Sequence, residues 1–276
     1  MYLKKINPCI VINSLVYFLL AYFFVAFLSN LVLIAIAKFI GFDAILSYNG
    51  FVLSGAKWTN DNIIAIYFFG NLISLIIALL FRRIYYIERK STSKIKIFYL
   101  WLYIISISWF MGEIIIGALF HTGIGAALIA FRVPFMFRFA LAIVGILVLL
   151  FIGKKAQKHV MHSANSYFTS ITSHKIGVFF ANQFLLPTVL GFLVIVLFKL
   201  PNISRYNYVD LYMLLSIGFV VMGLLLGYGQ LKSITFYSRN SKKLLRPECR
   251  ISYKPIALLV FVILIIRVGL MNGINF

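Results

Sequence analysis

The sequence predicts an all-α, polytopic integral membrane protein: a bundle of about seven transmembrane helices with a cytoplasmic N-terminus. Hydrophobic residues make up 63% of the 276 residues and charged residues 12%. In soluble domains, hydrophobic residues make up about 45–50% and charged residues about 25%. Apolar runs of about 20 residues, enough to cross a roughly 30 Å hydrocarbon core, recur along the chain. The bilayer must therefore be the solvent for most of this protein.

Seven apolar stretches have the length of a membrane span. They cover residues 10–40, 63–81, 97–120, 133–152, 176–198, 209–231 and 256–276. The first is longer than a bilayer requires, so we expect it to tilt, to break near residues 29–30, or to continue beyond the membrane. The last is the weakest, because Arg267 and Asn272 interrupt it. If this last stretch did not cross the membrane, the other six spans would keep their orientation, and only the side on which the C-terminus lies would change.

The basic residues alternate between the two ends of these spans. Nineteen of the 26 Lys and Arg residues precede the first span or fall between spans two and three, four and five, and six and seven. Cytoplasmic loops are the ones enriched in Lys and Arg, so this end is predicted to face the cytoplasm. The net charge of +20 then reflects orientation and anionic lipid headgroups, not nucleic-acid binding. The many Ile, Phe, Lys and Asn residues and few acids are typical of bacterial cytoplasmic (inner) membrane proteins.

The connections between spans are too short for a separate soluble domain, so residues 1–276 are predicted to form a single transmembrane domain. The basic segment 153–175 is expected to lie along the cytoplasmic interface as a short helix. A glycine- and aromatic-rich loop, residues 43–61, is expected to cap the outer face, although tight turns explain its glycines equally well. Gly223 and Gly227 form a GxxxG pattern, which indicates close packing within the protein or between protomers. Cys9 and Cys249 imply no disulfide framework.

The third span carries an acidic residue near mid-bilayer, Glu113, followed by Gly117 and His121. A carboxylate at this depth costs about 2.5–3.5 kcal/mol on insertion scales, so it requires compensation. One interpretation is a carboxylate that binds a proton or substrate, with His121 at the mouth of the site. The other is a protonated Glu113 that bonds across helices, with His121 solvated. Arg138 is the candidate ionic partner, although it can equally reach the outer surface.

Neutral polar residues in other spans are candidates for the same site. Asn71 lies in the second span, and Asn182 and Gln183 lie about one turn before Pro187 in the fifth. Pro187 leaves backbone carbonyls without their helical donor, and the two neighbouring amides are placed to bond them. These residues either join helices by hydrogen bonds or line a polar cavity shared with Glu113.

No specific catalytic signature is present. HExxH, GxSxG and Walker motifs are absent from the sequence. We expect no cofactor and no metal site, with His159 and His162 solvated near headgroups. The favoured hypothesis is a transporter or a small-ligand or lipid-binding protein that uses an intramembrane carboxylate. Its candidate binding residues are Glu113, His121, Arg138, Asn71, Asn182 and Gln183.

Two other hypotheses stay open. The first is a structural or assembly subunit that joins other membrane subunits. The second, less favoured, is an intramembrane hydrolase in which Glu113 and His121 would be catalytic.

Overall fold

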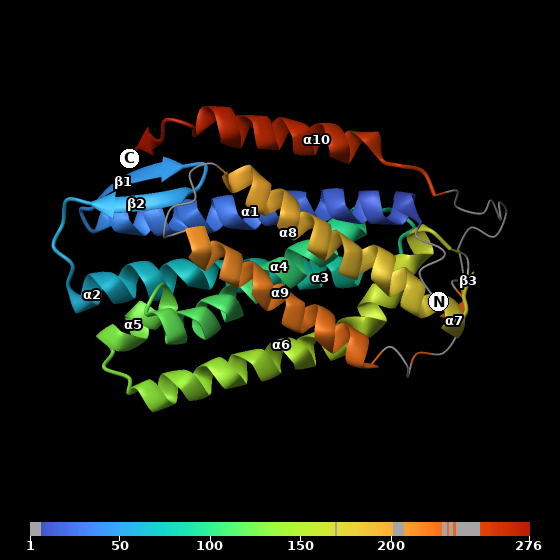
Figure 1. The fold of residues 1–276 in the computed structure, drawn as a ribbon, viewed down its shortest axis with the longest axis horizontal. Helices are drawn as coiled ribbons and strands as arrows, with labels where there is room; N and C mark the ends of the chain where they lie inside the picture. Colours follow the sequence, from blue (N-terminus) through green and yellow to red (C-terminus); the bar gives the residue numbers. More distant parts are fainter. Residues whose placement is uncertain (1–6, 169, 201–206, 228–230, 232–233, 236–248) are drawn as a thin grey trace.

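The structure, a computed structural model, is an elongated all-α bundle with small β-sheets at its two ends (Figure 1). It describes residues 7–168, 170–200, 207–227, 231, 234–235 and 249–276, without the side chains of 174, 207–214 and 234–235. Several basic residues counted above therefore lie outside the described residues: Lys4, Lys5, Arg205, Lys232, Arg239, Lys242, Lys243 and Arg246.

The long helices run along the length of the molecule. They are α1 (Pro8–Phe39), α3 (Gly70–Glu88), α4 (Ile95–Phe120), α6 (Phe135–Ser163), α8 (Leu186–Lys199), α9 (Asn207–Gly227) and α10 (Tyr253–Leu264). Short helical segments extend or join them: α2 (Asn60–Ile63), η2 (Ile64–Phe69), α5 (Ile124–Ala130), η3 (Ala164–Ser166), α7 (Ser173–Phe180), η4 (Ala181–Leu185) and η6 (Ile265–Gly269). Of these, η2, η4 and η6 are π-helical and η3 is a 3₁₀ turn.

Five helical segments in the described part of the chain are long and apolar enough to cross a membrane. They are Pro8–Phe39, Asn60–Glu88, Ile95–Phe120, Phe135–Ser166 and Lys175–Lys199, which match the first five predicted spans. The sixth and seventh predicted spans correspond to α9, where Leu215–Gly227 is a shorter apolar helix, and to α10 with 12 residues. The helical membrane class is thus supported, with five spans meeting the length criterion.

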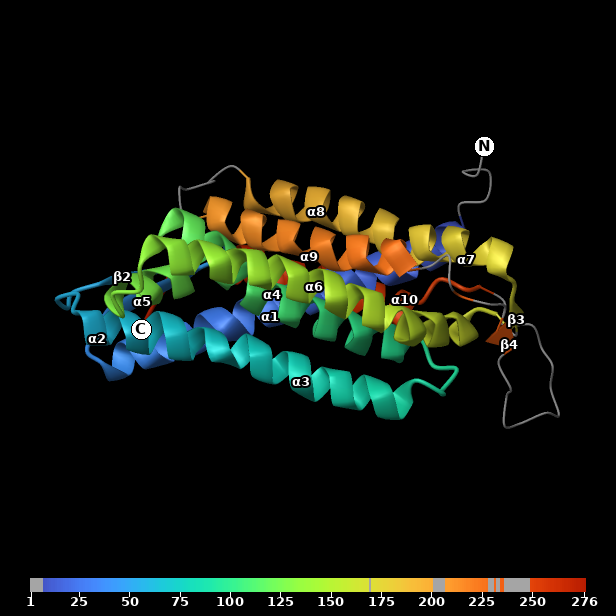
Figure 2. The same ribbon diagram turned by 90° about the horizontal axis from the view of Figure 1, so that it is seen from below.

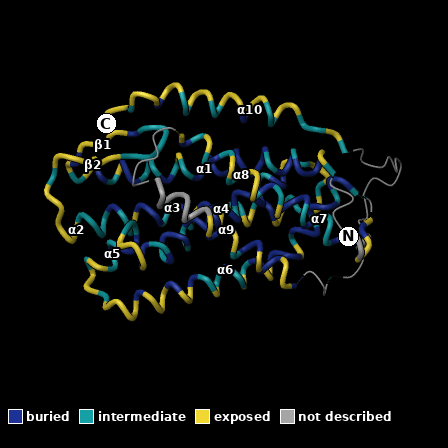
Figure 3. Tube along the Cα trace, viewed as in Figure 1, coloured by how far each residue is buried: buried dark blue, intermediate teal, exposed yellow. Residues whose placement is uncertain are grey.

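Helix α4 is the centre of the bundle, and α6 lies at its periphery. In the most apolar stretch of each helix, 67% of the residues are buried in α4 but only 22% in α6 (Figure 3). Helices α1, α3, α6 and α9 all contact α4. The turned view shows α3 on one side and α8 with α9 on the other (Figure 2). Trp101 of α4 packs between the rings of Phe18 and Phe184, each 4.9 Å away between ring centroids.

The first span is a single unbroken helix, so the break considered at residues 29–30 does not occur. Ser29, which faces the interior, lies 3.0 Å from Ser74 of α3 between hydroxyl oxygens. This hydrogen bond satisfies both hydroxyls without disturbing the helix. At its start, the side chain of Asn7 accepts the N–H of Cys9, and Pro8 occupies the first turn.

The predicted interfacial helix at 153–175 is wrong, because residues 153–163 continue α6 and the rest of the segment does not form one helix. Gly153 contacts α9 so closely that a Cβ there would lie 2.2 Å from the carbonyl oxygen of Val220. One turn later, Gln157 donates a hydrogen bond of 2.9 Å to the carbonyl of Leu224. Since α9 provides both contacts, α6 stays inside the bundle up to Ser163.

The GxxxG residues of α9 face α6 within the same chain. A Cβ on Gly223 would lie 2.2 Å from the carbonyl oxygen of Leu150, and one on Gly227 would lie 1.9 Å from Nε2 of Gln157. Gly218, by contrast, has no atom within 4 Å of such a Cβ. The glycine pattern therefore serves packing within the chain.

The loop expected to cap the outer face folds as a β-hairpin. Strands β1 (Asp43–Ser47) and β2 (Gly50–Ser54) pair antiparallel, and Ser47 opposes Gly50 across a two-residue turn of Tyr48 and Asn49. The C-terminal strand β5 (Ile274–Asn275) pairs with β1 and completes a three-stranded sheet. At the opposite, basic end, β3 (Ser170–Ile171) pairs with β4 (Ile234–Thr235).

Contrary to the expectation from sequence, Cys9 and Cys249 form a disulfide. They lie 240 residues apart in sequence and 5.9 Å apart between Cα atoms. The bond joins the first turn of α1 to the segment that leads into α10. Cysteine spacing does not show this proximity, because it arises only when the last helix packs beside the first.

Candidate functional site

The buried carboxylate of Glu113 lies at the turn between α4 and α5. His121 ends α4 in a left-handed conformation, with φ of 58°, and Gly123 follows with φ of 52°. The chain then starts α5, and the backbone N–H of Ile124 donates to Oε2 of Glu113 at 3.3 Å. An acidic group is favourable at the first turn of a helix, because the N–H groups there have no partner within the helix. Glu113 can thus cap α5.

Glycines bring the backbones of α4 and α5 into direct contact. A Cβ on Gly125 would lie 1.8 Å from the carbonyl oxygen of Gly117, and one on Gly123 would lie 1.7 Å from Oε2 of Glu113. Gly117 has no side chain, which leaves room beside α4. In the structure, α5 takes that room.

His121 and Arg138 contact each other at the end of α4. Nη1 of Arg138 lies 3.0 Å from Nδ1 of His121. Since arginine only donates hydrogen bonds, Nδ1 of His121 is the acceptor in this contact. Arg138 is 8% exposed, so the guanidinium is buried and does not extend to the surface. The histidine itself is exposed.

Asn71 lies at the junction of η2 and α3, in the half of the bundle nearer the hairpin. Its side-chain amide donates to the carbonyl of Tyr67 at 2.8 Å. The preceding Gly70 packs against Leu33 near the end of α1. Asn71 is 1% exposed, and its Oδ1 has no hydrogen-bond partner among the described residues.

Asn182 and Gln183 are buried in η4, in the other half of the bundle. The carbonyl of Gln183 is four residues before Pro187, so it lacks its helical donor. Ser14 of α1 donates its hydroxyl to this carbonyl at 2.6 Å and accepts the indole N–H of Trp101 at 2.9 Å. A neighbouring helix, not the Gln183 amide, thus satisfies the carbonyl. The amide itself is buried without a hydrogen-bond partner among the described residues.

The structure brings some of the predicted site residues together and separates others. His121 and Arg138 form one pair, with Glu113 on the adjoining turn. Gln183 contacts Ser14, whereas Asn71 follows Gly70, which packs on Leu33 about 28 Å further along α1 by helical rise. One small molecule therefore cannot contact both Asn71 and Gln183.

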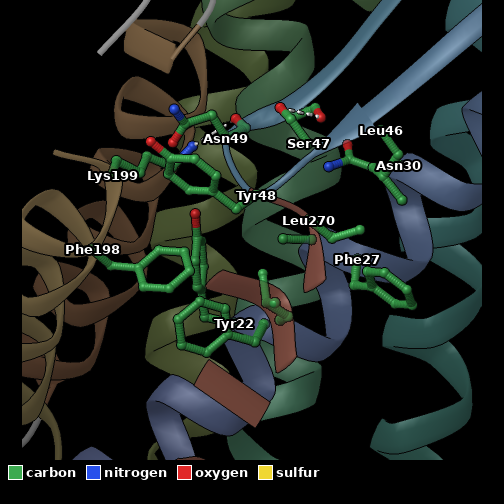
Figure 4. A pocket seen from close by; sticks show the side chains of 14 residues that line it. Tyr22, Phe27, Asn30, Leu46, Ser47, Tyr48, Asn49, Phe198, Lys199 and Leu270 are labelled. Carbon is green, nitrogen blue, oxygen red and sulfur yellow. Dashed lines mark hydrogen bonds between the residues drawn. The ribbon is translucent and has the colours of Figure 1, made fainter. Parts of the chain in front are cut away.

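A pocket that the sequence did not indicate lies at the hairpin end of the bundle (Figure 4). It has a volume of about 40 Å³, room for a few water molecules. Four elements far apart in sequence form its walls: α1, the β1–β2 hairpin, the end of α8, and η6 with the following turn. The lining residues are Tyr22, Phe23, Ala26, Phe27, Asn30, Leu46, Ser47, Tyr48, Asn49, Gly50, Phe198, Lys199, Ile266 and Leu270.

Two cationic side chains, those of Lys199 and Arg267, lie at this pocket. Lys199 is only 4% exposed, and its ammonium donates to the carbonyl of Asn49 at 3.4 Å. The guanidinium of Arg267 lies 4.1 Å from the ring centroid of Tyr48. It also donates to the carbonyls of Phe198 and Leu200, at 2.6 and 2.7 Å. Among the described residues that line the pocket, none is acidic.

Arg267, which weakened the seventh predicted span, thus caps the C-terminal end of α8. Cations are favourable there because the last carbonyls of a helix lack donors. The available sequence signals for the pocket were the Tyr48–Asn49 turn and a lysine at the end of a span. Neither identifies the pocket without the packing of α10 beside α1.

Comparison with known proteins identifies no relative of this chain. The chain matches no protein-family model, no curated protein and no solved structure.

Proposed function

We propose that this chain is a seven-span protein of a bacterial cytoplasmic membrane that binds a small amphiphile in the pocket at its outer end. The single observation behind this proposal is a pocket whose mostly apolar lining includes a few polar groups, among them the buried Lys199. Binding pockets commonly combine a mostly apolar lining with a few polar groups that orient the ligand. Transport of the same ligand is the wider activity that such a site permits.

The lining indicates the chemistry of the ligand. The Lys199 ammonium and the Asn30 amide can both donate hydrogen bonds, while Phe23, Phe27 and Leu270 provide apolar surface. The ligand is therefore an amphiphile whose head group accepts hydrogen bonds. A volume of about 40 Å³ has room for a few water molecules, so the hairpin or η6 must shift for the head group and the adjoining apolar chain to enter together.

In this proposal the intramembrane carboxylate has a supporting role. Glu113 bonds the first turn of α5, and neither this residue nor Arg138 lines the pocket. The proposal thus keeps the ligand-binding hypothesis and moves the site from mid-bilayer to the outer end. No observation favours the subunit hypothesis, since the glycines of α9 that suggested it pack on α6.

Photolabelling in lipid nanodiscs tests the proposal. The probe is a fatty acid with a diazirine near its carboxylate, and labelled peptides are identified by mass spectrometry. We expect labels on the hairpin and on the α1 residues of the pocket. In Lys199→Met they should fall at least about fivefold, because a buried charge-assisted hydrogen bond is lost. Lys57→Met, an exposed lysine near the same end, is the matched control and should label like the wild type.

Thermal unfolding shows whether Lys199→Met is folded. Labels confined to the lipid-facing surface of α6, or equal labelling of the pocket in Lys199→Met and the wild type, would contradict the proposal.

A further inference from the structure

The segment that leads into α10 is fastened to α1 by two independent ties. The first is the disulfide between Cys9 and Cys249. The second is Asn13, one turn further along α1. Its side chain donates to the carbonyl of Arg250 at 3.1 Å and accepts the backbone N–H of Ser252 at 2.9 Å. Because Asn13 holds the same segment, the two sulfurs stay near each other even without the covalent bond.

Helix α10 depends on such ties because little of it is buried. Leu259 is the one buried residue of α10, and the helix packs mainly on α1. In Figure 1 it lies along one edge of the bundle beside α1. Its far end continues into η6, which supplies Ile266 to the outer pocket. The position of α10 therefore determines where one wall of that pocket lies.

The disulfide lies at the basic end, which the distribution of cations places in the cytoplasm. Disulfides are rare in that reducing compartment and, where present, are usually catalytic or redox-sensing. Cys9 is 8% exposed, whereas Cys249 is partly exposed and so is the sulfur a soluble thiol or disulfide reaches first.

We propose that Cys9 and Cys249 form a reversible thiol–disulfide clasp that regulates ligand access to the outer pocket by fixing α10 against α1. The oxidant is a low-molecular-weight disulfide, RSSR. The Cys249 thiolate attacks one of its sulfurs and releases one thiolate, which leaves a mixed disulfide. The Cys9 thiolate then displaces the second. Two protein sulfurs are oxidised, RSSR is reduced to two RSH, and these retain the two protons of the protein thiols.

The direction of the regulation follows from the pocket. With the disulfide formed, the pocket has a volume of about 40 Å³, which is room for a few water molecules and too small for an amphiphile. In the dithiol form the start of α10 is held to α1 by the Asn13 hydrogen bonds without the covalent bond, so η6 can move more freely and admit the ligand. This part of the inference rests on the proposed function, whereas the clasp itself does not.

The first experiment measures the thiol state in intact cells. Cells are quenched with acid, and cysteines are tagged with a mass-labelled maleimide. Since Cys9 and Cys249 are the two cysteines of the sequence, the band carries two tags or none. We expect two tags in growing cells, none after dipyridyl disulfide, and two again after dithiothreitol. A protein untagged throughout would be permanently cross-linked, and one with two tags throughout would never form the bond. Either result overturns the clasp.

Asn13→Ala tests the second tie. Without the amide, the sulfurs meet less often, so reoxidation after dithiothreitol should slow by roughly tenfold through loss of effective concentration. Asn60→Ala, an exposed asparagine near the hairpin, should reoxidise like the wild type. An unchanged rate in Asn13→Ala would overturn the role of Asn13.

The second experiment repeats the photolabelling on oxidised and reduced protein. Pocket labelling should be at least about fivefold higher in the reduced form. The double variant Cys9→Ser with Cys249→Ser should stay at the reduced level under both conditions. Equal labelling in both states would overturn the coupling and leave the proposed function standing. If the protein cycles between two maleimide tags and none but its pocket is never photolabelled, the proposed function is overturned and the clasp stands.

Discussion

At the scale of single residues, Glu113 shows how a carboxylate is accommodated in an apolar helix. Burial of the charged form is costly. The Ile124 N–H and the first turn of α5 offset part of this cost, because they place partial positive charge beside the carboxylate. The hydrogen bond requires an acceptor at this position, and it does not require the acceptor to be charged.

Glu113 is therefore expected to tolerate a substitution that keeps a hydrogen-bond acceptor. Glu113→Gln keeps an acceptor oxygen, so its free energy of unfolding should change by less than about 1 kcal/mol. Glu113→Leu leaves the Ile124 N–H buried without a partner and should cost about 1–3 kcal/mol. Thermal unfolding in detergent micelles measures both. If glutamine is as damaging as leucine, the charge itself is required, as a proton- or substrate-binding carboxylate would be.

At the scale of helices, the bend-prone segment at Pro187 is held by its neighbour. Proline removes the donor for the Gln183 carbonyl, and Ser14 of α1 replaces it. The same hydroxyl accepts from Trp101 of α4, so one serine connects three helices. A polar contact of this kind links helices in a bilayer, where water is not available as a partner.

A double-mutant cycle checks this connection. Ser14→Ala removes two buried hydrogen bonds and should cost about 2 kcal/mol. Pro187→Ala restores an N–H that can bond the Gln183 carbonyl. The double variant should therefore be about 1 kcal/mol more stable than the sum of the single effects. Ser54→Ala, an exposed serine of β2, serves as the control. Strict additivity would mean that Ser14 does not replace the proline's missing donor.

At the scale of the whole molecule, the distribution of cations and the packing of the segments both distinguish the two ends of the bundle. The hairpin and the C-terminal strand lie at one end (Figure 1), and the hairpin lines the pocket there. The connection between α3 and α4 lies at the other end (Figure 2), where Cys9 and Cys249 form the disulfide. An even distribution of cations would leave the orientation open. The observed excess at the disulfide end predicts that this end faces the cytoplasm.

Cysteine labelling checks the orientation and the number of spans. In a background with both native cysteines replaced by serine, Lys57→Cys should react with an impermeant maleimide from outside. Thr92→Cys, between α3 and α4, should react only after permeabilisation. Met271→Cys, beyond η6, should label from outside if the chain crosses seven times. Labelling of Met271→Cys only from inside would mean that α10 does not cross.

The sequence by itself determined the helical class of this protein and the five helices that are long and apolar enough to cross a membrane. These follow from composition and from apolar length, which are local properties of a chain in a bilayer. The polar residues of single helices, such as Glu113 and Gln183, were visible too, because polarity is unusual there. Their partners were not visible. The N–H of Ile124 and the hydroxyl of Ser14 belong to turns and helices whose approach depends on packing.

Only the tertiary structure decided the pocket, the disulfide and the use of the glycines. Each joins segments that lie far apart in sequence, such as Cys9 with Cys249 or Tyr48 with Arg267. In a membrane, all helix faces are similarly apolar, so hydrophobic periodicity does not show which helices touch. Close backbone contacts at glycines and the satisfaction of buried polar groups select the arrangement instead, and both depend on the fold as a whole.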